Sequence, residues 1–329
     1  MEKVASLIEQ FSELKDPRQP INQEHKFIDI IVIAICATLC GADDWVAVEQ
    51  FGRAKASWFS RFLDLPNGIP AHDTFWRVFR FLDAACFEHC FMQWVATVQN
   101  VLAGELIAVD GKQLRRSYDG VAGNRAIQLV SAWASENQLV LGQSKITEKT
   151  NEISAIPHLL ACLQLRGCLV ATDALNCQSK TAQAILDQEA DYLLSLKENH
   201  PLLYEDVVLL FDGLATDIAA GAGYTYAFDT ATQADKGHGR IEVRKTWTIH
   251  DPHLIQPLRT AEKWPQLTTI IKVQAEHYLN HHHSCETRYY ISSATASADT
   301  FLTKIRTYWS IENSLHWVLD SAFREDHSR

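Results

Sequence analysis

The sequence lacks any stretch that is both long and apolar enough to cross a bilayer. Its longest apolar run, Phe27 to Cys40, is about four residues short of a membrane span and contains Asp29. The N-terminal segment mixes acidic, basic and apolar residues, without the charged, apolar and small-residue order of an export signal. We therefore expect a cytoplasmic protein with a buried helix at this run and no membrane partner.

The sequence also lacks cysteine pairs with metal-binding spacing, and its net charge is not positive. Of the eight cysteines, Cys36 and Cys40, like Cys86 and Cys90, lie one helical turn apart among apolar residues, which indicates buried thiols. The net charge of −10 argues against a protein that coats nucleic acid, because phosphate binding needs a positive field. Local basic patches, or an acidic cluster around metal ions, remain compatible with it.

Apolar residues make up 47% of the 329 residues. A chain of this length and composition can bury the cores of two or three domains. Residues 1–97 carry aromatic and aliphatic side chains at three- and four-residue intervals, which predicts an N-terminal helical domain. Its basic residues include Arg53, Lys55, Arg61, Arg77 and Arg80. A helix-turn-helix contact with DNA and the solvated face of a packing module both fit this pattern.

From residue 98 the pattern changes to short apolar strands broken by turns. Strands are predicted over Leu106–Val109, Ile127–Trp133, Leu139–Gln143, Leu169–Ala171 and Tyr192–Leu196, and helices over Glu152–Leu163 and Ser179–Asp187. Three strands followed by alternating helix and strand is the order of a ribonuclease-H-like α/β domain, which predicts the first part of that core over 98–215. Residues 216–297 predict a β-rich insertion, and 298–329 return to helix.

Two aspartates follow strands that read as buried. The apolar run Leu106–Val109 ends in Asp110, and Leu169–Thr172 ends in Asp173. A partly buried carboxylate is tolerated only when it is paired or bound to metal. Each aspartate taken alone could equally be a strand-end turn or a helix cap.

A third carboxylate, Glu312, falls on the apolar stripe of the last helix. The other members of that stripe are Phe301, Ile305, Trp309, His316 and Leu319. A glutamate aimed at the core needs a partner, and a metal cluster shared with Asp110 and Asp173 would supply one. Alternatively, Glu312 belongs to a buried ion-pair network, for which the candidate cations are Arg116, Arg125 and Lys197.

Oxygen ligands of this kind suit hard divalent cations. Magnesium uses one or two carboxylates plus waters and substrate oxygens, so three carboxylates suit two ions, and Mn²⁺ is able to substitute. Two ions about 4 Å apart could activate a water or a 3′ hydroxyl and stabilise the leaving oxygen of a phosphodiester.

Several motifs together resemble one family across nearly the entire chain. They are residues 64–74, 107–112, 152–156, Thr172-Asp173-Ala174 with Gln178, 192–199, Gly237-His238-Gly239-Arg240 with Glu242 and Arg244, and 309–317. The sequence looks like the insertion-sequence DDE transposases, and specifically the H-repeat-associated transposase-like proteins of bacteria.

That resemblance implies a ribonuclease-H-like catalytic domain, a β insertion, magnesium, and cleavage and joining of double-stranded DNA at transposon ends by a homodimer that forms on DNA. Asp110, Asp173 and Glu312 match its acidic triad. By resemblance, the candidates for DNA contacts are Lys197, Asn199, His238 and Arg240. Just past the first carboxylate, Lys112, Arg115 and Arg116 could hold the scissile backbone or form a solvated basic turn.

Two departures from the family pattern accompany the likeness. The larger group has an arginine four residues before the glutamate and a lysine seven after it, where this chain has Tyr308 and Leu319. Arg306 and Arg324 are candidate substitutes. We also expect a shortened copy, since the family would continue into more helix. The alternative function is therefore a truncated, catalytically inactive DNA-binding remnant.

Two further alternatives rest on single segments. Val109-Asp110-Gly111 is compatible with an aspartate-based phosphotransferase, although Lys112 stands where such enzymes usually carry a second acid. His277 and His281–His283, with Cys285, could bind zinc or form a surface loop between two strands.

Overall fold

The structure is a computed structural model. It describes residues 2–99, 102–114, 117, 126–146, 151–219, 228–237, 240–279 and 282–327. The chain divides into two compact units, one comprising residues 1–100, 114–126 and 317–329 and the other residues 101–113 and 127–316. No helix within the described ranges is long and apolar enough to cross a membrane.

The first unit is helical. Its elements are α1 (Glu2–Phe11), η1 (Pro20–Asn22), α2 (Phe27–Leu39), α3 (Trp45–Ala54), α4 (Ala56–Phe59), α5 (His72–Phe81), α6 (Ala84–Val98), α12 (Trp317–Ser321) and η4 (Glu325–His327). The long apolar run forms α2, whose Ile30, Ile31 and Ile33 are fully buried in the core of this unit. On α5, Trp76, Arg77 and Arg80 are exposed, so a DNA contact by this unit stays a prediction.

The prediction of buried thiols is only partly right. Cys90 is buried and Cys36 is half-buried, whereas Cys40 and Cys86 are exposed. Cys40 is the C-cap of α2 and Cys86 lies in the first turn of α6, so both exposed thiols stand at helix ends.

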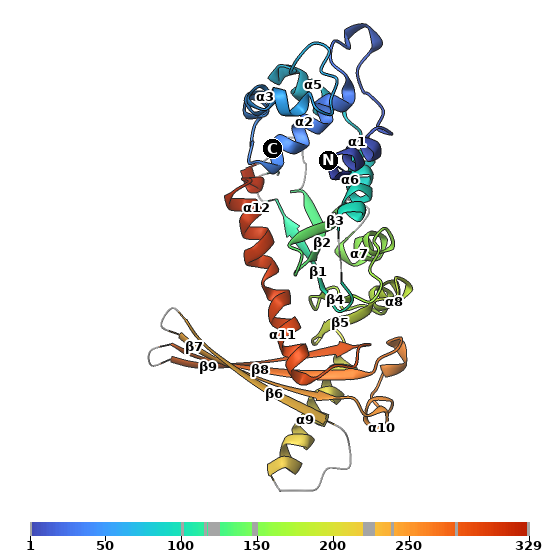
Figure 1. Cartoon of the computed structure of the whole chain (residues 1–329). Coiled ribbons are helices and arrows are strands. Elements are labelled where there is room, and N and C mark those ends of the chain that lie inside the picture. The colour runs from blue at the N-terminus through green and yellow to red at the C-terminus, as the bar shows by residue number, and fades with distance from the viewer. Residues whose placement is uncertain are drawn as a thin grey trace. The chain divides into compact units, whose positions relative to one another are not determined.

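The second unit is built on a sheet in which nine strands are described (Figure 1). They are β1 (Leu106–Gln113), β2 (Gln128–Ala134), β3 (Leu139–Ile146), β4 (Leu169–Thr172), β5 (Asp191–Leu196), β6 (Phe228–Gly237), β7 (Arg240–Ile249), β8 (Thr269–Leu279) and β9 (His282–Ser292). Their order is β3-β2-β1-β4-β5-β9-β8-β7-β6. β1, β4 and β5 are parallel neighbours, and the other pairs are antiparallel.

Helices cover this sheet on both faces. The helical elements are α7 (Glu152–Ala161), α8 (Ser179–Asp187), α9 (Pro201–Ala219), α10 (Pro252–Ile255), η2 (Ala261–Lys263), α11 (Ala298–Trp309) and η3 (Glu312–His316). Figure 1 shows α7 and α8 on one side of the sheet and α11 on the other. The predicted strands and the helices α7 and α8 are found, and α9 is an addition. The strands within 216–297 continue the same sheet, because β9 pairs with β5.

β1 starts from a buried carboxylate, Glu105, which is 1% exposed. Its two oxygens accept hydrogen bonds from the backbone N–H groups of Leu102 (3.3 Å), Glu136 (3.2 Å) and Asn137 (2.9 Å), and from the Asn137 side-chain amide (2.6 Å). Glu105 thus ties the beginning of β1 to the turn between β2 and β3. Four donors depend on one side chain.

Glu105→Ala should therefore lower the free energy of unfolding of the second unit by about 2–4 kcal/mol, because buried donors lose their acceptor. Denaturant unfolding followed by circular dichroism measures this loss. Glu189→Ala, at an exposed turn, is the matched control and should change the midpoint little. Equal midpoints for Glu105→Ala and wild type would contradict the assigned role.

Candidate functional site

Two parallel strands bring the predicted aspartates together. Asp110 lies on β1 and Asp173 directly follows β4. Val109 is in register with Thr172, so the two aspartates are the next residues along neighbouring strands. Adjacent strands lie about 4.8 Å apart, which makes Asp110 and Asp173 close neighbours at the carboxyl end of these strands.

Asp173 is held by the residue three positions later. Its Oδ1 accepts hydrogen bonds from the backbone N–H of Asn176 (3.0 Å) and from the Asn176 side-chain amide (2.8 Å). Asn176 is fully buried, so its amide is a rigid support. Both bonds use Oδ1, and no hydrogen bond or ion pair among the described residues reaches Oδ2 of Asp173.

Glu312 departs from its predicted setting. The helical wheel placed it on a buried stripe, but its side chain is exposed, while Ile311 and Leu315 are 1% and 5% exposed. Glu312 is the first residue of η3, a π-helical turn, in which the hydrogen-bonding period is wider than in an α-helix.

Despite its exposure, Glu312 lines the same cavity as the two aspartates. This acidic cavity has a volume of about 260 Å³. Its lining consists of Asp110, Asp173, Ala174, Leu175, Ser195, Lys197, Tyr308, Trp309, Ile311 and Glu312. Residues more than 200 positions apart in sequence therefore share one space.

The pKa of the Asp110 carboxyl reflects its burial close to other negative charges. This pKa is raised from the usual 3.8 to about 7, mainly by burial and also by the charges of Asp173, Glu152 and Glu312, against a hydrogen bond from the Gly111 N–H that lowers it. On the other side, His316 Nδ1 of η3 lies 3.7 Å from Asp110 Oδ2. A cation near Asp110 would relieve the cost of the charged form.

Two of the predicted DNA-contacting residues flank this cavity. Lys197, directly after β5, is exposed and lines the acidic cavity. Asn199 is exposed as well, but its amide donates to the Ala174 carbonyl (2.8 Å) and so supports the loop after Asp173. The structure thus brings Lys197 to the acidic residues and gives Asn199 a bracing contact.

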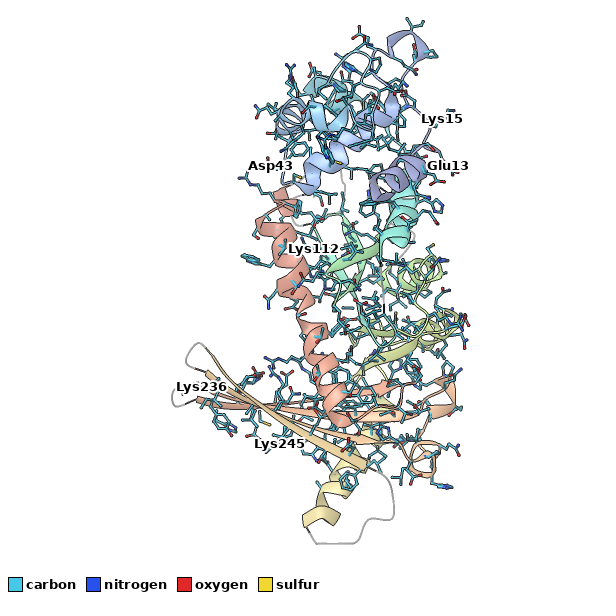
Figure 2. The ribbon with its side chains drawn as sticks, in the orientation of Figure 1. Glu13, Lys15, Asp43, Lys112, Lys236 and Lys245 are labelled. Carbon is cyan, nitrogen blue, oxygen red and sulfur yellow. The ribbon has the colours of Figure 1, made fainter. Side chains whose placement is uncertain are left out.

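Among the other predicted DNA-contacting residues, Lys112 is described and most of the rest are not. Lys112, which Figure 2 labels, is half-buried on β1. It stands two residues after Asp110 and therefore on the same face of the strand. Arg115, Arg116 and His238 lie outside the described residues, and so does the side chain of Arg240. Their roles stay predictions.

The candidate substitutes for the family's arginine and lysine have partners of their own. Arg306 pairs with Asp235 (2.6 Å), and Arg324 lies 3.5 Å from Asp43. Tyr308, at the position of the family arginine, is 4% exposed and lines the acidic cavity. Within the described ranges, no salt bridge joins Glu312 to Lys197, so the ion-pair alternative gains no support there.

The donor set fits a hard divalent cation without forming a closed cage. Across the described parts of the chain, no group of three or more His, Cys, Asp or Glu side chains is close enough to hold a metal by itself. Magnesium does not require such a cage, since it keeps several waters and takes substrate oxygens. The proposed zinc tract likewise forms no such group among its described members, His277, His283 and Cys285.

Two larger cavities share lining residues with the acidic cavity. One, of about 680 Å³, shares Ala174, Leu175, Ser195 and Lys197. The other, of about 590 Å³, shares Trp309 and Glu312. Arg288 lines both larger cavities, and its guanidinium lies 4.4 Å from the centre of the Trp309 ring. Sequence reasoning missed Arg288, Asn176 and Glu152, although Glu152 stands within a matching motif.

Comparison with known proteins shows the family of this chain. A family model described as the transposase DDE domain matches residues 78–329, and a second, described as associated with it, matches residues 8–95. The chain is 36% identical to "Putative transposase YncI" of Escherichia coli O157:H7, over 99% of this chain and 82% of the relative. It is 35% identical to "H repeat-associated putative transposase YhhI" of Escherichia coli, over 98% and 84%.

A further relative is an "Uncharacterized protein in dhlA 3'region" of Xanthobacter autotrophicus, 41% identical over 87% of this chain and 94% of the relative. The chain belongs to the DDE transposase family, as the resemblance predicted.

The raised pKa of Asp110 makes stability depend on pH. Because the folded-state pKa (about 7) exceeds the unfolded value near 3.8, the stability contributed by the protonated carboxyl is full below about pH 4 and is lost as the pH rises through 7. Asp110→Asn should therefore stabilise the metal-free protein at about pH 8 by on the order of 2 kcal/mol, and the difference should shrink towards pH 4.

Thermal unfolding across that pH range measures the difference. Asp187→Asn, at an exposed position on α8, is the control and should show no such trend. A wild-type protein more stable than Asp110→Asn at pH 8 without divalent cations would contradict the crowding of charge at this site.

Proposed function

We propose that this chain is a DDE transposase that cuts and joins phosphodiester bonds at insertion-sequence ends, with Asp110, Asp173 and Glu312 as the ligands of its divalent cations. The observation that carries the proposal is their convergence. Three acidic side chains from β1, from the loop after β4 and from η3 line one cavity in a member of this family.

A ribonuclease-H-like catalytic core is part of the proposal. Strands β3-β2-β1-β4-β5, with the first three antiparallel and the last three parallel, support it. In this reading, β6–β9 form the insertion that precedes the acidic helix. The insertion extends the core sheet, and β7 and β8 contact α11.

Magnesium, or manganese in its place, would activate the attacking water or 3′ hydroxyl and stabilise the leaving oxygen. Asp110 and Asp173 would bind it from adjacent strand ends, and Asn176 keeps Asp173 oriented with Oδ2 available. Glu312, which lines the same cavity, would complete the ligand set.

The two larger cavities suggest the path of the DNA strand. Lys197 joins one of them to the acidic cavity, and Arg288 lines both. Positive side chains beside a scissile phosphate hold the backbone and carry no sequence information themselves. Transposon ends and target are thus the proposed substrates, bound by a homodimer that forms on DNA in the cytoplasm.

A nicking assay tests the cleavage proposal. A duplex carrying the inverted repeats that flank this gene should be nicked by the wild-type protein with Mg²⁺ or Mn²⁺. Asp110→Asn, Asp173→Asn and Glu312→Gln should each lower the rate by at least roughly 100-fold, because each removes a cation ligand. Asp187→Asn should cut normally. A wild-type protein that binds the duplex without cutting it would instead be the inactive DNA-binding remnant.

The DNA path is tested separately through Lys197. Lys197→Ala should weaken duplex binding similarly for all sequences and reduce the slope of log affinity against log salt by about 1, since one phosphate contact is lost. Arg166→Ala, at the exposed opposite end of β4, is the matched control. An unchanged salt dependence for Lys197→Ala would remove this residue from the DNA path.

A further inference from the structure

A cavity of about 590 Å³ lies next to Glu312, lined by residues of β7, β8, β9, α11 and η3. On β9 it is lined by Glu286, Arg288 and Tyr290, which alternate along the strand and so share one face of it. Trp309, the last residue of α11, lines it as well. Because Trp309 and Glu312 also line the acidic cavity, the two cavities are neighbours.

Tyr290 brings a buried hydroxyl without a partner to this cavity. The residue is 3% exposed, and within the described residues its Oη makes no hydrogen bond. Burial raises the pKa of Tyr290, so the hydroxyl keeps its proton and is a donor. Trp309 and Arg288 lie close enough to oppose this rise, but not with the length and angle of a hydrogen bond. Buried hydroxyl groups almost always have a partner, and an acceptor in the cavity would supply one.

Two further donors lie beside this hydroxyl. The buried Nε1 of Trp309 likewise has no hydrogen-bond partner in the part of the chain that the structure describes. The Arg288 guanidinium lies 4.4 Å from the centre of the Trp309 ring. It donates to Glu286 through Nε (2.7 Å) and Nη2 (2.9 Å), and neither bond uses Nη1. Donors of Tyr290, Trp309 and Arg288 therefore lie together, and the first two have no acceptor.

Net charge does not decide what this cavity binds. Among its described lining residues are three arginines and three glutamates, whose formal charges balance. The arginines also have carboxylate partners, since Arg244 pairs with Glu242 (2.5 Å), Arg288 with Glu286 (2.7 Å) and Arg306 with Asp235 (2.6 Å). What the cavity offers a ligand is its unsatisfied donors. A fitting ligand has to bring oxygen acceptors.

The position of the cavity favours the phosphate oxygens of a DNA strand. A ligand here lies next to the acidic cavity, where the proposed cleavage takes place. A strand cut in the acidic cavity continues past it with one phosphate per nucleotide, and each phosphate offers acceptor oxygens. Half to two-thirds of the hydrogen bonds between proteins and DNA go to phosphate and sugar, and arginine and tyrosine are among their donors.

We propose that Tyr290, Trp309 and Arg288 form a phosphate subsite, which binds the DNA backbone beside the scissile phosphate. This inference rests on the proposed function. The subsite lies on the Glu312 side of the acidic cavity and contains none of the proposed cation ligands. Its three side chains are positioning residues, because they hold the strand and take no part in the bond that breaks.

Duplex binding by Tyr290→Phe tests the proposal. The duplex carries the inverted repeats that flank this gene, and binding is measured without divalent cations so that the strand stays intact. Tyr290→Phe removes only the hydroxyl and should weaken binding roughly 10-fold, as expected for a lost hydrogen bond to a charged group. Its unfolding midpoint should equal or exceed that of wild type, because the hydroxyl has no partner among the described residues of the free protein.

Tyr192→Phe is the matched control. This tyrosine of β5 is fully buried too, but its hydroxyl donates to the Pro265 carbonyl (3.0 Å). Tyr192→Phe should therefore lower the unfolding midpoint and leave the affinity for DNA unchanged. A Tyr290→Phe chain that is destabilised in the same way and binds DNA normally would overturn the proposal.

Methylphosphonates locate the phosphate that the subsite binds. Each replaces one backbone phosphate by a neutral group, and they are placed singly on either side of the scissile bond. At one flanking position the change should weaken wild-type binding roughly 10-fold. It should cost Tyr290→Phe or Trp309→Phe little more, because these variants have already lost the contact. Equal losses for wild type and both variants at every position would contradict a shared contact.

The outcomes separate this inference from the proposed function. If the wild-type chain binds and nicks the duplex and Tyr290→Phe binds as tightly, the subsite falls and the cation site stands. If the wild-type chain does not bind this duplex, both proposals fall. Weaker binding by Tyr290→Phe and Trp309→Phe, with Tyr192→Phe unchanged, supports the subsite.

Discussion

Repulsion among carboxylates at the ends of two parallel strands is the constraint on which this site depends. Asp110 and Asp173 are adjacent because β1 and β4 run in register, and burial removes the water that would screen them. Neighbouring elements add acid instead of relieving it, since the charges of Glu152 and Glu312 also act on Asp110. Such a site is stable near neutral pH when a carboxyl keeps its proton or a cation binds.

The local structure around these acids also involves the carboxylates directly. Asn176 donates both its backbone N–H and its side-chain amide to one oxygen of Asp173, Gly111 leaves room for Glu152, and Glu312, the first residue of η3, lines the acidic cavity. None of these features improves the packing of an apolar core. We propose that they support a ligand that carries positive charge.

Much of this could be predicted from the sequence where local pattern decides the outcome. Apolar runs bounded by turns marked β1, β4 and β5, and an acid after a fully apolar run marked Asp110 and Asp173, because the run itself implies burial on both faces. For Glu312, the predicted burial is wrong, because its side chain is exposed although it lines the acidic cavity. A helical wheel assumes the α period throughout, whereas residues Glu312–His316 form a π turn. The contact between Gly111 and Glu152 joins a strand to a distant helix and leaves no local signal.

Anomalous diffraction from crystals soaked in manganese chloride would show whether a divalent cation binds at the ends of β1 and β4. We expect a manganese peak at bonding distance from carboxylate oxygens of both Asp110 and Asp173. Peaks confined to other parts of the molecule, with both aspartates lacking a bound ion at saturating manganese, would contradict it.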